Sequence, residues 1–290
     1  MDNTRQTGDE QAIAWNGPAG RAWVDAQEVL DQMFKPFEDL LVKAVAARSA
    51  DRVLDVGCGT GSTTLAVARL LGTNGRCTGV DISEPMIAAA RTRAERESLP
   101  ASFIRASAET HAFEPESFDM IISRFGVMFF DDSVRAFAHL RRAATRDAEL
   151  RFLAWRSAAE NPFMTTAERA AAPLLPNLPA RRPDAPGQFA FADRRRVYSI
   201  LDESGWVEIE IEPLDVACTV PADGLGRYLD RIGPVGRILQ DVDDQTRTQV
   251  IETVRAAFER YVDGSEVRFS AACWMVGARA SAEPKETMTP

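Results

Sequence analysis

Three glycines stand in a short turn that could bind a small ligand through its backbone. The turn, Gly-Cys-Gly-Thr-Gly at 57–61, follows an apolar run at 52–56 that is typical of a buried strand. Because glycine has no Cβ, the backbone can approach a ligand closely there. The helix expected to follow adds free N–H groups and the positive end of its dipole. The turn therefore suits an anionic group such as a carboxylate.

An acidic residue at the end of the next expected strand narrows the ligand class. Asp81 lies about 20 residues beyond the glycines, where a carboxylate accepts hydrogen bonds from ribose hydroxyls. The dinucleotide fingerprint Gly-x-Gly-x-x-Gly is not met, because its third glycine is replaced by Ser62. Asp55, just before the turn, would repel a pyrophosphate and suits an ammonium group. These features favour S-adenosylmethionine (SAM), which carries an ammonium, a carboxylate and a ribose, over a nicotinamide dinucleotide.

The elements that must position these residues alternate between strand and helix. Strands are expected at 52–56, 77–80, 102–105, 118–123, 150–155, 207–212 and 269–276, and helices between the first five at 62–71, 84–97 and 133–143. This alternation predicts an α/β fold with a doubly wound, mainly parallel sheet of seven strands. Right-handed crossovers place the carboxyl ends of the parallel strands at one edge, where ligands bind.

Changes in composition along the chain predict five regions. They are an N-terminal helical lid at 1–48, a SAM-binding core at 49–156, a Pro-rich insert or cap at 157–192, the remainder of the sheet with helical cap elements at 193–280, and a disordered tail at 281–290.

The motifs at 55–61, 79–83 and 118–121 resemble those of the class I SAM-dependent methyltransferase family. The similarity is greatest to its small-molecule branch, the methyltransferase type 11-like enzymes similar to those of ubiquinone and menaquinone biosynthesis. The segment 123–130 also resembles one common in that branch. The resemblance covers about residues 50–156 and implies a Rossmann-like fold, SAM as the methyl donor and S-adenosylhomocysteine (SAH) as the product.

The resemblance also implies a set of cofactor-binding residues. Gly57, Cys58 and Gly59 would contact the methionine moiety through their backbone, and Asp81 would bind the ribose hydroxyls. Further residues expected around the cofactor are Asp55, Ile82, Met86, Ala108, Glu109, Ser123 and Trp23. Many relatives carry an aspartate where this chain has Ser107, so Glu109 is an alternative contact for the adenine amino group. A second departure is Arg-Asp-Ala at 146–148, where many relatives have Pro-Gly-Gly; an effect on stability rather than on binding is expected.

The acceptor pocket is expected to be formed by the lids and by the segment after the fourth strand. Its candidates are Trp15, Arg124, Phe125, Met128, Trp155, Asn161, Phe163 and Phe189. No pattern identifies a catalytic base. His111, His139 and Arg124 are weak candidates, since each histidine is better explained by a surface position and the arginine equally well by an ion pair on the rim. The four cysteines are scattered and only two histidines exist, so no metal site is predicted.

Charge and composition limit the partners. The 290 residues carry 34 basic and 43 acidic side chains, a net charge of −9 that disfavours nucleic-acid binding. No secretory signal or membrane-spanning stretch is recognised, and the sparse cysteines fit a reducing compartment, so a cytoplasmic location is expected. The expected oligomeric state is a monomer or a homodimer.

The sequence thus predicts a SAM-dependent methyltransferase that moves a methyl group to a small, partly apolar organic acceptor by in-line displacement. Two alternatives stay open: a SAM- or SAH-binding protein that does not methylate, and a nicotinamide-dependent oxidoreductase. Asp55 and Ser62 argue against the second.

Overall fold

The central sheet has the predicted doubly wound, mainly parallel arrangement. The computed structural model describes residues 11–178, 181, 185–225, 233–239 and 242–280. Its strands are β1 (Arg52–Val56), β2 (Arg76–Asp81), β3 (Ala101–Arg105), β4 (Phe118–Arg124), β5 (Ala144–Trp155), β6 (Trp206–Pro221), β7 (Val262–Asp263) and β8 (Glu266–Ala280). Their order is β3-β2-β1-β4-β5-β8-β6, with β7 pairing only with β8. The first five strands are mutually parallel, and β8 is antiparallel to both of its neighbours on the main path.

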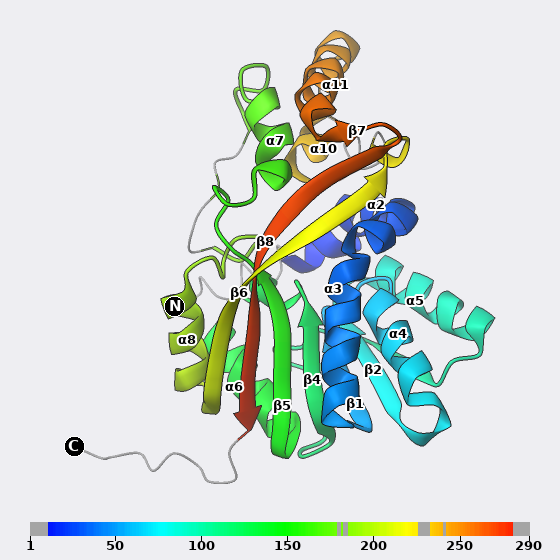
Figure 1. Ribbon diagram of the computed structural model, residues 1–290, viewed down its shortest axis with the longest axis vertical. Coiled ribbons are helices and arrows are strands. Elements are labelled where there is room, and N and C mark those ends of the chain that lie inside the picture. Colours follow the sequence, from blue (N-terminus) through cyan, green and yellow to red (C-terminus); the bar gives the residue numbers. More distant parts are fainter. Residues whose placement is uncertain (1–10, 179–180, 182–184, 226–232, 240–241, 281–290) are drawn as a thin grey trace.

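The middle strands are apolar because helices cover both faces of the sheet. Leu54 on β1 and Ile121 on β4 are fully buried and lie side by side in the parallel register. The helices are α2 (Pro18–Asp25), α3 (Gln27–Arg48), α4 (Ser62–Leu71), α5 (Glu84–Glu97), α6 (Ser133–Ala143), α7 (Pro162–Ala171), α8 (Arg194–Glu203), α10 (Gly233–Ile238) and α11 (Asp244–Phe258). Helices α3 and α4 pack together, as do α6 and α8, and α5 packs on β3 (Figure 1).

The long helix α3 runs along the sheet, from the carboxyl ends of the parallel strands to their amino ends. Its buried residues Met33, Phe37, Leu41 and Val45 recur every four positions and face the core. The sequence suggests an interruption at Pro36, but the helix continues through it. Burial of this continuous apolar face compensates for the hydrogen bond that proline cannot donate.

A separate group of helices lies beyond the carboxyl edge of the sheet. Figure 1 shows β6 and β8 continuing past the other strands as a two-stranded ribbon, with α7, α10 and α11 at its far end. Helix α7 packs on α11. The rings of Phe163 (α7) and Phe269 (β8) stack with centroids 3.7 Å apart, and Phe258 (α11) meets Phe163 edge-on at 5.1 Å. We call α7, α10, α11 and this end of the ribbon the cap.

The Pro-rich stretch contributes α7 to this cap, beginning with Pro162 in the first helical turn. The expected tail at 281–290 lies outside the described residues, as does the start of the expected lid. None of the helices in the described ranges combines the length and apolar character needed to cross a bilayer.

Candidate functional site

A cavity of about 1010 Å³ lies at the carboxyl edge of the parallel strands. Its walls come from the loops after β1, β2, β3 and β4, from residues 11–34, and from the cap. This is the edge at which α/β sheets bind ligands. The loops and cap together form a single compartment with a polar end near the glycine turn and an aromatic end near β5.

The glycine turn adopts a backbone that other residues rarely tolerate. Gly57 and Gly59 have φ angles of 69° and 55°. A Cβ on Gly57 would lie 2.6 Å from the Cα of Gly126, so the loops after β1 and β4 touch backbone to backbone. A Cβ on Gly59 would have only the Sδ of Met86 within 4 Å, at 3.7 Å. The turn is therefore held by its neighbours at Gly57 and faces more open space at Gly59.

Asp81 is fastened to this turn and also lines the cavity. Its two carboxylate oxygens accept hydrogen bonds from the backbone N–H of Gly59 and of Ser83, both at 2.9 Å. Burial raises the pKa of Asp81, and the hydrogen bonds from Ser83 and Gly59 oppose that rise. A glycine turn and an anchored carboxylate on one wall fit the carboxylate and ribose of SAM.

The N-terminal segment closes one side of the cavity. The Asn16 amide donates to the carbonyl of Ile82 at 3.1 Å and accepts from the N–H of Glu84 at 2.9 Å. The Ser83 hydroxyl donates to the carbonyl of Trp15 at 2.7 Å. The Trp15 ring meets that of Phe129 edge-on at 5.4 Å, which connects the segment to the loop after β4. Residues 11–23 thus form a lid over the cavity.

The loop after β3 supplies the wall expected for the adenine. Ala108, Glu109 and Ser107 all line the cavity, together with Ile82 and Met86. The Glu109 carboxylate accepts hydrogen bonds from two backbone N–H groups, of Asp131 at 3.1 Å and Asp132 at 3.3 Å. Burial raises its pKa, and those two hydrogen bonds act in the opposite direction. Glu109 therefore also holds the loop after β4 against the loop after β3.

Aromatic rings form the other end of the cavity. Phe125 and Trp155 stack with ring centroids 4.4 Å apart and planes 13° from parallel, and Phe34 of α3 tilts against both. Met128 and Phe163 complete this end with residues of the cap. A flat apolar molecule would find a matching surface here.

Most of the predicted site residues meet in this cavity. Those in its lining are Trp15, Trp23, Gly57, Cys58, Gly59, Asp81, Ile82, Met86, Ala108, Glu109, Arg124, Phe125, Met128, Trp155 and Phe163. Cys58 has a pKa raised well above the usual value by burial, so its thiol is not poised as a nucleophile.

Asp55 and Ser123, expected at the cofactor, lie behind the cavity wall. Asp55 is buried and accepts a hydrogen bond from the Thr64 hydroxyl at 2.6 Å, because alternate residues of β1 face opposite sides of the sheet. Burial raises its pKa to about 6. The Ser123 hydroxyl donates to the carbonyl of Val56 at 2.7 Å and accepts from the N–H of Gly126 at 3.1 Å. Asp55 thus connects β1 to α4, Ser123 connects β4 to the end of β1 and to the turn after β4, and neither residue is in the cavity lining.

Two residues expected in the acceptor pocket also lie outside its lining. The Asn161 side chain exchanges two hydrogen bonds with the backbone of Ala272, each 2.9 Å long, and so fastens the start of α7 to β8. The Phe189 ring lies under the guanidinium of Arg181, 4.6 Å from its centre. Asn161 thus secures the cap, and Gly187 and Gln188 line the cavity where Phe189 was expected.

The histidines do not reach the cavity. A ring nitrogen of His139 contacts the carbonyl of His111, and the other ring nitrogen pairs with the Arg142 guanidinium at 2.8 Å. The His111 ring packs edge-on against Phe113. Neither lines the cavity, so the structure does not support the weak expectation that one acts as a base.

Several cavity residues were not expected. Asp31 and Phe34 come from α3, Glu168 and Phe258 come from the cap, and Arg181 comes from the segment after α7. Helical spacing shows that α3 has an apolar face but not which residue of that face meets a cavity. The cap residues carry no local signal, because their position depends on how the ribbon folds over the sheet.

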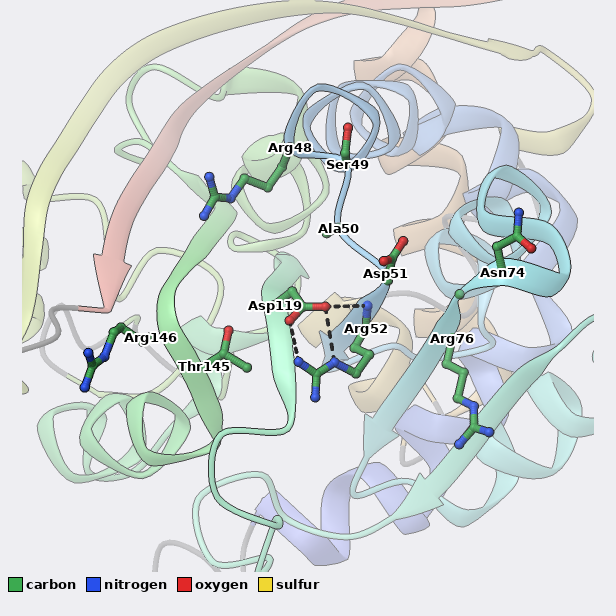
Figure 2. A pocket seen from close by; sticks show the side chains of 11 residues that line it. Arg48, Ser49, Ala50, Asp51, Arg52, Asn74, Arg76, Asp119, Thr145 and Arg146 are labelled. Carbon is green, nitrogen blue, oxygen red and sulfur yellow. Dashed lines mark hydrogen bonds and ion pairs between the residues drawn. The ribbon is translucent and has the colours of Figure 1, made fainter.

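A second hollow, of about 680 Å³, lies at the amino edge of the same strands. Figure 2 shows its side chains, among them four arginines: Arg48, Arg52, Arg76 and Arg146. The Arg52 guanidinium and backbone N–H both bond the Asp119 carboxylate, at 2.7 to 3.3 Å. This hollow shares no residue with the cavity at the carboxyl edge.

Comparisons with known proteins agree with the geometry. Residues 53–147 match the family described as methyltransferase domain. The chain is 32% identical over 139 residues to aklanonic acid methyltransferase DauC of Streptomyces sp. (strain C5), covering 48% of this chain and 55% of that protein. It is also 32% identical over 126 residues to the uncharacterized methyltransferase YcgJ of Bacillus subtilis (strain 168), covering 42% and 48%. The chain thus spans about half the length of these curated relatives.

A solved structure of the same relative shows the fold over a longer stretch. The crystal structure of the YcgJ protein from Bacillus subtilis superposes with a TM-score of 0.55 and 18% identity, covering 85% of this chain and 98% of that one. The similarity therefore extends well beyond residues 53–147 in fold, although the sequences have diverged.

Proposed function

We propose that this chain, whose residues 53–147 form a class I SAM-dependent methyltransferase domain, transfers a methyl group from SAM to a small, partly apolar organic acceptor. One observation carries the proposal: the glycine turn and Asp81 share a single cavity with a compartment of aromatic rings. One end suits the cofactor and the other an apolar acceptor. The finer placement in the branch of ubiquinone and menaquinone biosynthesis stays a prediction.

The residues at the polar end are suited to hold SAM. The backbone of the glycine turn would bind the methionine moiety, Asp81 the ribose hydroxyls, and Ile82 and Met86 would flank the adenine. When bound, SAM would supply an electrophilic methyl group, with the thioether SAH as the leaving group opposite the attacking atom of the acceptor. The lid of residues 11–23 would exclude water from this end of the cavity.

The aromatic end is suited to position the acceptor. Its rings come from α3, from the loop after β4, from β5 and from the cap, so they surround a molecule on several sides. Among the described residues that line the cavity there is no histidine, and alignment of the two reactants is the main contribution that the protein would make. The relative DauC is named for methylation of aklanonic acid, which supports an organic acid as one class of acceptor.

We also propose that the protein works in a reducing, cytoplasmic compartment as a monomer or homodimer, without a nucleic-acid partner. The four cysteines Cys58, Cys77, Cys218 and Cys273 are free and buried, which supports a reducing compartment. The net charge of −9 supports the absence of nucleic acid among its ligands.

Calorimetric titration of the purified chain with SAM, SAH and NAD tests the cofactor. We expect micromolar binding of the first two and none of NAD. Mass spectrometry of incubations with SAM and a panel of small organic acids and phenols then tests the transfer. Accumulation of SAH together with an acceptor 14 Da heavier supports methylation. Binding without SAH formation favours the alternative of a SAM-binding protein, and a folded chain that binds neither SAM nor SAH overturns the proposal.

A further inference from the structure

Arg124 is a half-buried cation that faces the cavity. It is the last residue of β4 and is part of the cavity lining. Its guanidinium donates one long hydrogen bond, 3.4 Å, to the carbonyl of Phe34, and it lies 5.7 Å from the centre of that residue's ring. A guanidinium has five N–H donors and remains protonated in proteins. Within the described part of the chain, no carboxylate forms an ion pair with it, so most of its donors have no protein acceptor.

Three carboxylates act on Arg124 from a distance, but each has another partner. Asp31 pairs with Arg93 at 2.8 Å. Glu38 accepts a hydrogen bond from the Ser62 hydroxyl and pairs with Lys35 at 3.2 Å.

The third carboxylate, Asp55, is bound by the Thr64 hydroxyl. Burial raises the pKa of Asp55 to about 6, so its charge is lost in mildly acidic solution. Arg93 is the ion-pair partner of Asp31, and Lys35 is shared between Glu38 and Asp39. Burial lowers the pKa of Arg124, and the charges of Asp31, Glu38 and Asp55, in that order, oppose this change. All three act from a distance, so the guanidinium donors have no carboxylate in contact among the described residues.

The surroundings of Arg124 on the cavity side are aromatic. Phe34 lies against the guanidinium, and the stacked pair of Phe125 and Trp155 lies against Phe34, with ring centroids 5.7 Å and 6.2 Å away. Burying a cation among rings is costly unless an anion or several acceptors compensate. A ligand that combines a flat apolar body with an anionic group would satisfy both the rings and the unused donors.

We propose that Arg124 binds an anionic group of the acceptor, and that the acceptor is a flat, apolar organic acid. This inference rests on the proposed methyl transfer and names its substrate class. Arg124 is then the residue that distinguishes an ionised acid from a neutral molecule of the same shape. The carboxylate of SAM is the competing ligand for the same guanidinium. The position of Arg124 at the end of β4, against Phe34, Phe125 and Trp155, favours the acceptor.

The test compares two probes of equal shape, 2-naphthoate and 2-naphthamide, titrated calorimetrically into the full-length chain saturated with SAH. The wild type should bind the carboxylate at least about tenfold more tightly than the amide, the preference that hydrogen bonds to a charged group typically confer. In Arg124→Met this preference should fall to within twofold, while the affinity for SAH stays within twofold of the wild type. The surface variant Arg69→Gln, which removes one positive charge on α4, should retain the full preference.

Three results would overturn the inference. They are equal binding of both probes by the wild type, an unchanged preference in Arg124→Met, and a loss of SAH affinity in that variant, which would assign Arg124 to the cofactor. If Arg124→Met does not fold, as judged by thermal melting, Arg124→Lys replaces it. Lysine keeps the charge but loses the forked geometry, so the affinity for naphthoate should fall severalfold and that for naphthamide should not; an unchanged ratio contradicts the inference.

Different results would contradict the proposed function and this inference. If the chain does not bind SAH, methyl transfer is excluded, and the preference for naphthoate can still be measured without SAH. If SAH binds and forms from SAM but the probes bind equally, only the substrate class is wrong.

Discussion

Arginines stand at both edges of the sheet, and their surroundings differ. At the amino edge the Arg52 side chain is half exposed and pairs with Asp119 at 2.7 Å (Figure 2). Arg48, nearby, donates to the carbonyl of Asp147 at 2.6 Å and lies 4.0 Å from Glu149. At the carboxyl edge Arg124 is half-buried beside aromatic rings and has one long hydrogen bond. Arg52 thus forms a solvated ion pair at one edge, whereas most N–H donors of Arg124 at the other edge have no protein acceptor among the described residues.

The difference shows that charge alone does not mark a binding site. An exposed ion pair contributes about 0–1 kcal/mol, because water and salt screen it and both side chains lose freedom. A cation that is partly withdrawn from water loses solvation, and carboxylates at a distance or a bound anion can offset this loss. The amino edge carries more arginines, but Arg124 at the carboxyl edge lies against aromatic rings and has donors available to a ligand.

The largest effect is expected from Phe37→Ala in α3, the helix that joins the two edges. Phe37 is fully buried and contacts the rings of Phe125 and Trp155, with centroids 5.0 Å and 6.1 Å away. Its truncation should lower the free energy of unfolding by about 3–5 kcal/mol, measured by denaturant unfolding. Gln32→Ala, at an exposed position of the same helix, should change it by less than about 0.5 kcal/mol. A loss below 1 kcal/mol for Phe37→Ala would mean that the side chains around Phe37 can move to fill the space.

The pH dependence of stability is expected to be dominated by buried acids at the carboxyl edge. The pKa of Asp55 rises from 3.8 to about 6 on folding, so the folded state binds the proton more strongly than the unfolded state. Asp55 therefore lowers stability progressively as pH increases from about 4 to about 6, by up to about 3 kcal/mol. Asp55→Asn has no carboxyl group that titrates at this position. The free energy of unfolding of the variant relative to the wild type should therefore rise from about pH 4 to about pH 6.

Denaturant unfolding of both proteins at pH 4 and pH 7 measures this change. The Thr64 hydroxyl opposes the rise in the pKa of Asp55. Thr64→Val should therefore shift the window to higher pH. A difference between Asp55→Asn and the wild type that is the same at both pH values would contradict the assignment to Asp55.

Asp81→Ala should weaken SAM binding by about 1–3 kcal/mol, the usual cost of losing hydrogen bonds to a charged group. The loss would include a looser glycine turn, because the Gly59 N–H loses its acceptor. Asp119→Ala removes a carboxylate at the amino edge and should leave SAM affinity within twofold of the wild type. Calorimetric titration of both variants with SAM measures the two affinities. Unchanged affinity in a folded Asp81→Ala protein would disprove the ribose assignment.

The smallest effect is expected at the amino edge itself. Arg52→Gln removes the ion pair with Asp119 and should cost less than about 1 kcal/mol of unfolding free energy. A double-mutant cycle with Asp119→Asn isolates the coupling between the two side chains. A coupling above 2 kcal/mol would show that this edge is less solvated than its exposure indicates, and the contrast between the two edges would weaken.

Much of the polar end of the cavity could be predicted, because its signals are local. The glycine turn at 57–61, the acid at Asp81 and the alternation of strand and helix each depend on residues close together in the chain. Parallel strands then bring their carboxyl ends to one edge by topology alone. Trp15 and Trp23 were also expected at the site, and the hydrogen bonds of the N-terminal segment bring both to the cavity.

The direction of single side chains could not be predicted in the same way. Asp55 belongs to the correct motif but faces Thr64, and Asn161 bonds the backbone of β8 rather than a ligand. The turn at 146–148 lacks the usual glycines, and Asp147 takes a left-handed φ of 61° in their place. In each case the backbone position follows from the motif, and the side chain follows from the neighbours that it meets.

The sequence by itself determined the order of the elements, the class of fold and the residues of the cofactor turn, because periodicity, glycine and a strand-end acid act over short distances. Only the tertiary structure decided which side chains share the cavity. Arg124 meets Phe34 across 90 residues of chain, and Phe163 meets Phe258 between separate helices of the cap. These contacts depend on how α3 and the ribbon pack on the sheet, and no local pattern encodes the partial burial of an arginine beside a cavity.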